Sequence, residues 1–338
     1  MAVKAKLVEV KDLRTYFRLD QGTVRAVDGV SFEVQRGETL GIVGESGCGK
    51  SVTARSIMRL IRPPGQIVSG QVLLHQRHPA NGTPEEVVDL VALKPNGRRM
   101  RSIRGGEIAM VFQEPMTSLS PVHTVGDQIT EALRLHQPLS PRAAREQAAE
   151  MLARVRMAQP RRVIDQYPFE LSGGMRQRVM IAMALVCHPS LLIADEPTTA
   201  LDVTTEAQIL NVMRDLQREM GMAIMFITHN LGVIAQMAER VAVMYLGQIV
   251  EVAGVKDLFN RPSHPYTDAL LRSIPRMGKK SDQPLESIKG SVPDPYAQPQ
   301  GCRFHARCLR MMRGLCEREE PASYQIAPGH EVRCHLYR

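Results

Sequence analysis

The chain has 338 residues, of which 43% are apolar and 23% charged, as in folded globular proteins and unlike disordered ones. About 150 residues per domain allows roughly two domains, and six cysteines are too few for a disulfide-built scaffold. Lysine and arginine exceed aspartate and glutamate by 43 to 35. This excess fits nucleic acid, an anionic membrane surface or a phosphorylated ligand, but an aromatic content of 4% without tryptophan argues against a base-stacking platform.

Two absences bear on the compartment. Residues 1–30 lack the apolar stretch of a signal peptide. The longest apolar run, 179–187, is far shorter than the roughly 20 residues of a membrane-spanning helix. We therefore expect a cytosolic protein whose membrane role, if it has one, depends on a partner.

Up to about residue 260, short β-type runs alternate with helical patterns. Strands are predicted at 6–10, 30–34, 39–43, 107–112, 191–194, 223–228, 241–246 and 249–252, and helices at 51–61, 141–155, 174–187, 206–220 and 231–238. Several strands are continuous runs of Val, Ile, Leu and Met, which is typical of strands buried on both faces of an α/β sheet. Residues 94–104 carry five basic side chains and no acid, which indicates a solvated turn or a surface for phosphate or lipid headgroups.

A phosphate-binding loop is predicted between the strand at 39–43 and the helix that follows it. Its residues are Gly44, Glu45, Ser46, Gly47, Cys48, Gly49, Lys50 and Ser51. The glycines let successive backbone N–H groups face one phosphate, and the helix N-terminus adds partial positive charge. We expect Lys50 to neutralise the β- and γ-phosphates, Ser51 to coordinate Mg²⁺ and Cys48 to be a spectator.

Polar side chains follow three other predicted strands. Asp195 and Glu196 come after the apolar run at 191–194, so one carboxylate can meet Mg²⁺ while the other addresses water. We assign Asp195 to the metal and Glu196 to positioning and polarising the attacking water. Gln113 could hold the water or the metal, and His229 could reach the γ-phosphate, because phosphoryl transfer needs positioning and charge stabilisation.

A second anion-ready helix start lies at residues 171–175, where a serine and two glycines precede a helical run. One nucleotide site does not need two such starts, so this one can serve the nucleotide of a second subunit. The segment closely resembles the signature motif of ATP-binding cassette (ABC) ATPases. The motifs then fall in that family's order: Walker A 44–51, Q-loop Gln113, signature Leu171, Ser172, Gly173, Gly174 and Met175, Walker B 191–196, D-loop Ala200, Leu201 and Asp202, and switch His229.

This resemblance implies an ABC-type P-loop ATPase core over residues 1–260, with an antiparallel β subdomain and a helical subdomain at about 114–170 that touches a membrane partner. It also implies a head-to-tail ATPase pair, with each ATP between one Walker A and the opposite signature. Adenine would stack on Phe17, with Tyr16 as the alternative. Met175 stands where many members have Gln, and Asn230 where Asp is common; we expect neither to abolish activity.

Residues 261–338 form a small Cys-rich module rich in Pro and Gly. Its start, His264-Pro265-Tyr266, resembles the dipeptide/oligopeptide importer branch of ABC ATPases. Four cysteines follow within 33 residues: Cys302, Cys308, Cys316 and Cys334. In a cytosolic segment they indicate a metal site in place of a hydrophobic core, and all-Cys ligation suits an iron–sulfur cluster or Zn²⁺. The resemblance implies [4Fe–4S]; Zn²⁺ and a metal-free tail stay open.

The sequence therefore predicts the ATP-hydrolysing subunit of a multi-component importer of short peptides, peripheral on the cytoplasmic face of the inner membrane. Its expected partners are a second ATPase subunit (related or identical), two membrane permeases and, indirectly, an extracytoplasmic substrate-binding protein; no nucleic acid is expected. Nickel, glutathione or oligosaccharides are alternative cargoes of the same branch. A drug exporter, or a non-transport ABC protein of translation or DNA repair, is a further alternative.

Overall fold

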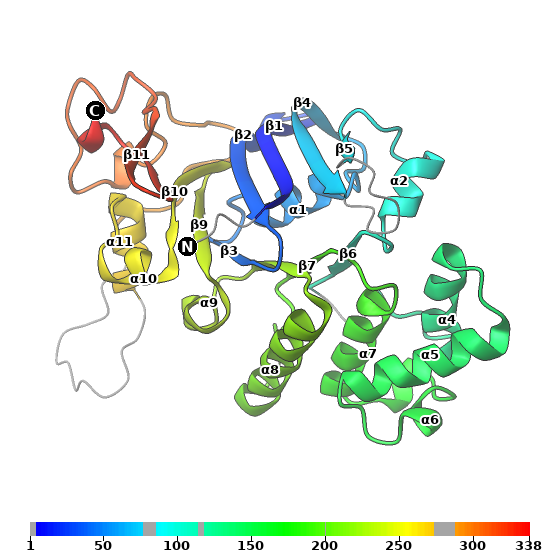
Figure 1. Cartoon of the computed structure of the whole chain (residues 1–338). Coiled ribbons are helices and arrows are strands. Elements are labelled where there is room, and N and C mark those ends of the chain that lie inside the picture. Colours follow the sequence, from blue (N-terminus) through cyan, green and yellow to red (C-terminus); the bar gives the residue numbers. More distant parts are fainter. Residues whose placement is uncertain (1–4, 77–85, 114–117, 200, 274–287) are drawn as a thin grey trace.

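The computed structural model describes residues 5–76, 86–113, 118–199, 201–273 and 288–338. Ala200 of the predicted D-loop and the first four residues of the predicted helical subdomain lie outside these ranges. Within them the chain forms two sheets with helices around them (Figure 1). Residues of both sheets share one hydrophobic cluster.

The smaller sheet is antiparallel, with the strand order β2-β1-β4-β5. Its strands are β1 (Lys6–Leu19), β2 (Gly22–Gln35), β4 (Gly65–Gln76) and β5 (Glu86–Asp89). Residues 6–10 and 30–34 lie in the first two strands, which are longer than the sequence predicts. Both are interrupted by register shifts, and such irregularities break the two-residue alternation on which a strand prediction depends.

The larger sheet has the order β11-β12-β10-β9-β3-β8-β7-β6. Its strands are β3 (Thr39–Val43), β6 (Ile108–Val111), β7 (Leu191–Asp195), β8 (Ala223–Ile227), β9 (Arg240–Tyr245), β10 (Gln248–Gly254), β11 (Ser323–Ala327) and β12 (His330–Arg333). Strands β6, β7, β8, β3 and β9 are parallel. The carboxyl ends of β3, β6, β7 and β8 therefore meet at one edge of the sheet, where ligands bind in such folds.

The predicted burial on both faces is confirmed for β3, β7 and β8, in which every residue is buried. All five residues of β8 are buried, and they alternate between two hydrophobic clusters. Ile224 and Phe226 pack in one cluster, and Met225 and Ile227 in the other. The unbroken apolar runs in the sequence thus reflect a sheet covered on both sides.

Helices cover this sheet and form a group of their own beyond β6 and β7 (Figure 1). They are α1 (Lys50–Ile57), α2 (Arg98–Ile103), α4 (Val125–His136), α5 (Pro141–Arg154), α6 (Pro160–Val163), α7 (Gly173–Leu185), α8 (Val203–Met220), α9 (Leu231–Met237), α10 (Val255–Asn260) and α11 (Pro265–Arg272). Several begin at a serine, threonine, aspartate or asparagine cap, which explains why their starts are readable in the sequence. Helix α4 is missing from the sequence prediction although Thr124 and Asp127 form its capping box.

The basic stretch at 94–104 contains α2 rather than only a turn. Met100 and Ile103 are buried and anchor one side of this short helix. Arg104 donates from Nε to the Met58 carbonyl and from Nη2 to the Arg59 carbonyl, both at 2.7 Å. The buried side chains of Met100 and Ile103 and the two carbonyl contacts of Arg104 therefore give this segment a structural role.

The C-terminal segment continues the larger sheet. Strand β12 pairs with β10 through Glu251↔Val332 and Val252↔Glu331, and β11 pairs with β12. Phe304 belongs to the same hydrophobic cluster as the cassette strands. The described part of this segment thus shares a sheet and a core with the rest of the chain, and the expected boundary at 260 stays a prediction.

Candidate nucleotide-binding site

The phosphate loop joins β3 to α1, as the sequence predicts. Gly44 and Gly49 have φ values of +153° and +106°, which side-chain-bearing residues rarely adopt. A Cβ on Gly44 would lie 2.1 Å from the Met244 carbonyl oxygen, and one on Gly49 would lie 2.2 Å from that of Ala26. Both positions therefore require glycine, because the loop curls directly against neighbouring backbone.

Lys50 begins α1 and lies across this loop. Its Nζ donates to the carbonyl oxygens of Gly44 at 2.8 Å and Glu45 at 3.0 Å, and the side chain is buried. Cys48 lies beside it, and burial raises the pKa of the Cys48 thiol. A neutral, buried thiol is a poor nucleophile, which is consistent with the spectator role expected from the sequence.

The two residues assigned to Mg²⁺ on the loop and on β7 are in contact. Ser51 Oγ donates to Asp195 Oδ1 at 2.9 Å. Burial raises the pKa of the Asp195 carboxyl, and the hydrogen bond from Ser51 opposes that effect. A hydroxyl and a carboxylate at one point are the oxygen ligands that Mg²⁺ uses beside phosphates.

Glu196 is the meeting point of the residues that follow the strands. Gln113 Nε2 donates to Glu196 Oε2 at 3.0 Å, and His229 Nδ1 lies 3.1 Å from Glu196 Oε1. Glu196 has a φ of +48°, a left-handed conformation that costs energy for a non-glycine residue and is common at functional sites. The ends of β6 and β8 thus bring two polar side chains to the carboxylate that follows β7.

Thr199 is a further member of this cluster that the sequence interpretation omits. Its Oγ1 donates to Glu196 Oε2 at 3.0 Å. In the sequence, the only signal for this contact is that the hydroxyl of Thr199 comes three residues after Glu196. The contact fixes the rotamer of Glu196 from its own chain segment.

The predicted signature residues form the start of α7. Ser172 is the N-cap, and its Oγ accepts a hydrogen bond from the Met175 N–H at 3.3 Å; Leu171 is buried. A Cβ on Gly174 would lie 2.8 Å from Cγ2 of Thr205 in α8, so glycine is needed for the approach of the two helices. The N-terminus of α7 is therefore built as the sequence predicts.

Of the predicted D-loop, Leu201 and Asp202 are described and Ala200 is not. Leu201 packs against the core. Asp202 caps α8, accepting from the N–H of Thr205 at 2.9 Å and from its hydroxyl at 2.7 Å, and these bonds lower the pKa of Asp202. Asn230 caps α9 in the same way, with Oδ1 accepting from the Gly232 N–H at 3.0 Å.

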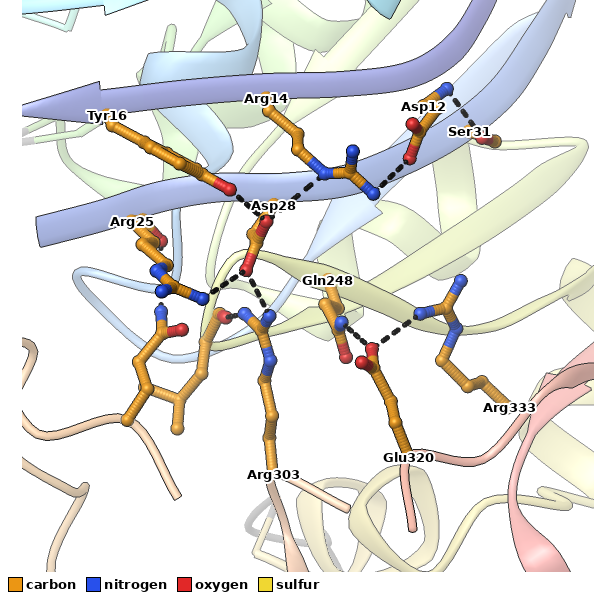
Figure 2. Close-up of polar contacts among 12 residues, drawn as sticks. Asp12, Arg14, Tyr16, Arg25, Asp28, Ser31, Gln248, Arg303, Glu320 and Arg333 are labelled. Carbon is orange, nitrogen blue, oxygen red and sulfur yellow. Dashed lines mark hydrogen bonds and ion pairs between the residues drawn. The ribbon is translucent and has the colours of Figure 1, made fainter. Parts of the chain in front are cut away.

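The two aromatic candidates for adenine differ in their surroundings. The Tyr16 hydroxyl donates to Asp28 Oδ1 at 2.6 Å, and the Arg25 guanidinium lies 5.7 Å from its ring centroid (Figure 2). The Phe17 ring lies against Gly65, where a Cβ would be 2.5 Å from Phe17 Cε1. Tyr16 is thus engaged in a polar network, which favours Phe17 as the stacking residue.

The predicted metal site at the four C-terminal cysteines is not supported by the structure. Across the described ranges, no three or more His, Cys, Asp or Glu side chains form a group that could hold a metal ion. Burial, with smaller contributions from the neighbouring Cys316, Cys334 and Cys308, raises the pKa of Cys302 to about 12. The four thiols therefore lie close enough to influence one another's charge, and they would have to lose their protons to bind a metal, since metals bind the thiolate.

Comparison with known proteins identifies the family. The sequence family described as ABC transporter matches residues 27–199, and the oligopeptide/dipeptide transporter C-terminal region matches residues 250–316. This chain belongs to the ABC transporter family of ATP-binding proteins. It is an ATPase of the kind that couples ATP hydrolysis to transport.

The relatives of this ABC ATPase match along almost all of its length. A probable peptide ABC transporter ATP-binding protein of Sinorhizobium fredii is 51% identical over 329 residues, 97% of this chain and 94% of that protein. An oligopeptide transport ATP-binding protein of Bacillus subtilis is 48% identical, covering 98% of this chain and 97% of the other.

Solved structures of ATP-binding cassettes are similar in fold to this ABC ATPase. A dimeric ATP-binding cassette in a post-hydrolysis state, bound to ADP and phosphate, has a TM-score of 0.63 and 26% identity over 74% of this chain and 99% of that one. Together with the antiparallel sheet β2-β1-β4-β5, this likeness confirms the predicted cassette fold. Among the described helices, none combines the length and apolarity needed to cross a membrane.

Proposed function

We propose that the chain is the ATP-hydrolysing subunit of an importer of short peptides. One observation carries the catalytic part: Gln113 and His229, from the ends of two different strands, both contact the Glu196 carboxylate. The match of residues 250–316 to the oligopeptide/dipeptide transporter region and the names of the relatives as peptide transport proteins support peptides as the cargo.

In this proposal the residues divide the work at the γ-phosphate. Lys50 leaves its carbonyl partners to neutralise the phosphates, and the backbone N–H groups of residues 44–51 surround them. Mg²⁺ would be held by Ser51, Asp195 and Gln113 and would offset charge on the phosphate oxygens. Glu196 orients and polarises the attacking water, with His229 beside it. Phe17 stacks on adenine.

A second ATPase subunit, identical or related, completes each site through its signature helix. The N-terminus of α7, with Ser172, Gly173 and Gly174, is oriented by its own cap to receive an anion. The dimeric state named for the solved cassette supports a pair. Two ATP molecules would then lie between the subunits and drive their closure.

Two membrane permeases are the proposed partners of the helical subdomain, at about 114–170. A cavity of about 700 Å³ lies between β6 and α7, and Phe112, Gln113, Met180 and Met183 are among its lining residues. A permease segment in this cavity would lie directly beside Gln113, so its movement would reach Glu196. In this proposal the chain lies on the cytoplasmic face of the membrane, and an extracytoplasmic binding protein acts through the permeases.

The extension from about residue 261 is proposed as a separate functional module. Its four cysteines would hold a [4Fe–4S] cluster, or Zn²⁺, once the thiols are deprotonated. Support comes from their number in 33 residues and from the mutual influence of the thiols. Iron, zinc and sulfide analysis of anaerobically purified protein tests this; a tail free of all three contradicts it.

Reconstitution with the two permeases in vesicles tests the proposed function. We expect ATP-dependent uptake of di- to pentapeptides when the binding protein is present, and no uptake with the Glu196→Gln variant. Nickel, glutathione and an oligosaccharide serve as competing cargoes in the same assay. Uptake of one of these in place of peptides would contradict the peptide assignment while leaving the ATPase assignment intact.

A further inference from the structure

The C-terminal extension reaches into the phosphate loop through one arginine. Arg307 Nη1 donates to Glu45 Oε2 at 2.7 Å, and Nη2 donates to Glu45 Oε1 at 3.0 Å. The Arg307 side chain is 5% exposed and that of Glu45 is 25% exposed. A two-point guanidinium–carboxylate pair of this kind is among the stronger ionic contacts in proteins and fixes orientation as well as charge.

The backbone of the same loop residue is held from the extension as well. The Glu45 N–H donates to the Tyr266 hydroxyl at 3.0 Å. Tyr266 is fully buried, and its ring lies 4.6 Å from that of Tyr245 and 5.4 Å from that of Phe304. Arg307 Nη1 also approaches the Tyr245 hydroxyl at 3.3 Å. The extension thus holds Glu45 both at its side chain, through Arg307, and at its backbone N–H, through Tyr266.

A second arginine of the extension contacts the antiparallel sheet. Arg303 donates to the buried Asp28 carboxylate of β2 and to the Leu246 carbonyl. Figure 2 shows Arg303 converging with Tyr16 and Arg25 on this carboxylate. The segment 303–307 therefore contacts the cassette at two separate points, which makes Arg307 part of an ordered interface.

The position of Glu45 gives the Arg307 contact a consequence for nucleotide binding. Lys50 Nζ lies 3.0 Å from the Glu45 carbonyl oxygen, so this acidic residue belongs to the loop that must receive a triphosphate. Without a compensating charge, the Glu45 carboxylate would repel the phosphates. This repulsion is only weakly screened by solvent and salt, because the site is partly buried. Arg307 supplies the compensating charge from outside the cassette motifs.

We propose that Arg307 is a positioning residue of the nucleotide site, which fixes and neutralises Glu45 and so sets the affinity of the phosphate loop for ATP. The inference rests on the proposed function, because it needs this loop to bind ATP. It gives the extension a role in the ATPase itself: nucleotide affinity depends on how the segment 303–307 is docked. That role does not depend on whether the cysteines hold a metal.

Titration of the full-length chain with Mg-ATP tests the proposal, with the variants Arg307→Gln, Glu45→Gln and the double variant. We expect Arg307→Gln to weaken ATP binding by about tenfold, as an unscreened charge near the phosphates does. The double variant should recover the affinity of Glu45→Gln, because the repelling charge is gone. Since it still lacks Arg307, misfolding cannot explain that recovery.

Two further variants keep the test decisive. Arg307→Lys retains the charge but loses the two-point contact, so its affinity is expected to lie between those of the wild type and Arg307→Gln. Arg338→Ala removes an exposed arginine of the same extension, paired with Glu319 at 3.1 Å, and is the matched control with unchanged binding. Equal affinity of Arg307→Gln and wild type, a double variant as weak as Arg307→Gln, or a Lys variant as weak as the Gln variant would overturn the inference. A wild-type chain that binds no ATP would instead defeat the proposed function.

Discussion

Gln113 donates a 3.0 Å hydrogen bond from its Nε2 to Oε2 of Glu196, across 83 residues of sequence. The two residues follow β6 and β7, which are neighbouring parallel strands. Because β6 leads out of the sheet towards the helical group and its adjoining cavity, this contact connects a surface region to the carboxylate assigned to water activation. A displacement at that surface can therefore change the position of Glu196.

His229 is expected to support hydrolysis rather than nucleotide binding. Its Nδ1 lies 3.1 Å from Glu196 Oε1, and its ring is 64% exposed, so removing it leaves no buried group unpaired. His229→Ala should lower kcat by about 100-fold, within the usual range for a proton-handling side chain, with an unchanged Kd for ATP. Steady-state ATPase assays and nucleotide titration measure both. His188→Gln changes an exposed histidine outside the Glu196 cluster and should have wild-type kcat; an equal loss there would contradict a specific role.

The Asp195 carboxylate is expected to lower the folding stability at neutral pH while it is required for Mg²⁺-dependent ATPase activity. Burial raises the pKa of its carboxyl in the folded chain, so the ionised form costs stability as the pH rises above the unfolded value of 3.8. Asp195→Asn keeps an acceptor for Ser51 and removes this cost. At neutral pH without nucleotide, the variant should melt on the order of a few degrees higher, while Mg²⁺-dependent ATPase activity is lost. A lower melting temperature would show that the carboxylate stabilises the fold instead.

Gly49 and Gly47 provide a matched pair in the phosphate loop. Both have positive φ values, +106° and +78°, but a Cβ on Gly49 would lie 2.2 Å from the Ala26 carbonyl oxygen, whereas one on Gly47 meets nothing within 4 Å. Gly47→Ala should cost about 1 kcal/mol of backbone strain. Gly49→Ala should cost several times more and abolish ATP binding, because β2 or the loop must move. Equal losses in denaturant unfolding and ATP titration would contradict the role of this contact.

His264 makes the fold sensitive to acid. Burial lowers its pKa from 6.5 to about 3, and its neutral Nδ1 accepts the Tyr266 N–H at 3.0 Å. Between pH 6.5 and 3 the unfolded chain binds a proton there that the folded chain does not, so stability falls as the pH falls, by up to about 1.4 kcal/mol per pH unit. His264→Asn keeps a helix cap and should reduce this slope in unfolding measured from pH 7 to 5. An unchanged slope would assign the acid sensitivity elsewhere.

Local signals in the sequence predicted the parts of the site that lie next to regular elements. The apolar runs placed β6, β7 and β8 to within about a residue, and the polar residues after them do meet at Glu196. The Ser172 cap marked the start of α7, because its hydrogen bond spans three residues, whereas α8 begins at Val203, three residues before the predicted start at 206.

Contacts between distant segments could not be predicted in the same way. Arg307 and Glu45 are 262 residues apart, and Tyr266 and Glu45 are 221 residues apart, and neither pair lies in a common motif. Strand β11 was missed because four of its five residues are exposed, so no apolar alternation marks it. Its pairing partner β12 is instead positioned by its pairing with β10.

The most direct test of the central claim is a single-turnover measurement of ATP hydrolysis by the Glu196→Gln variant. The substitution keeps the size of the side chain and a partner for Gln113 and His229, but removes the charge that polarises water. We predict that the variant binds ATP and remains paired with its partner subunit, while its hydrolysis rate falls by about 10²–10⁴-fold. Hydrolysis at a near-wild-type rate with bound ATP would remove Glu196 from the mechanism and contradict this account.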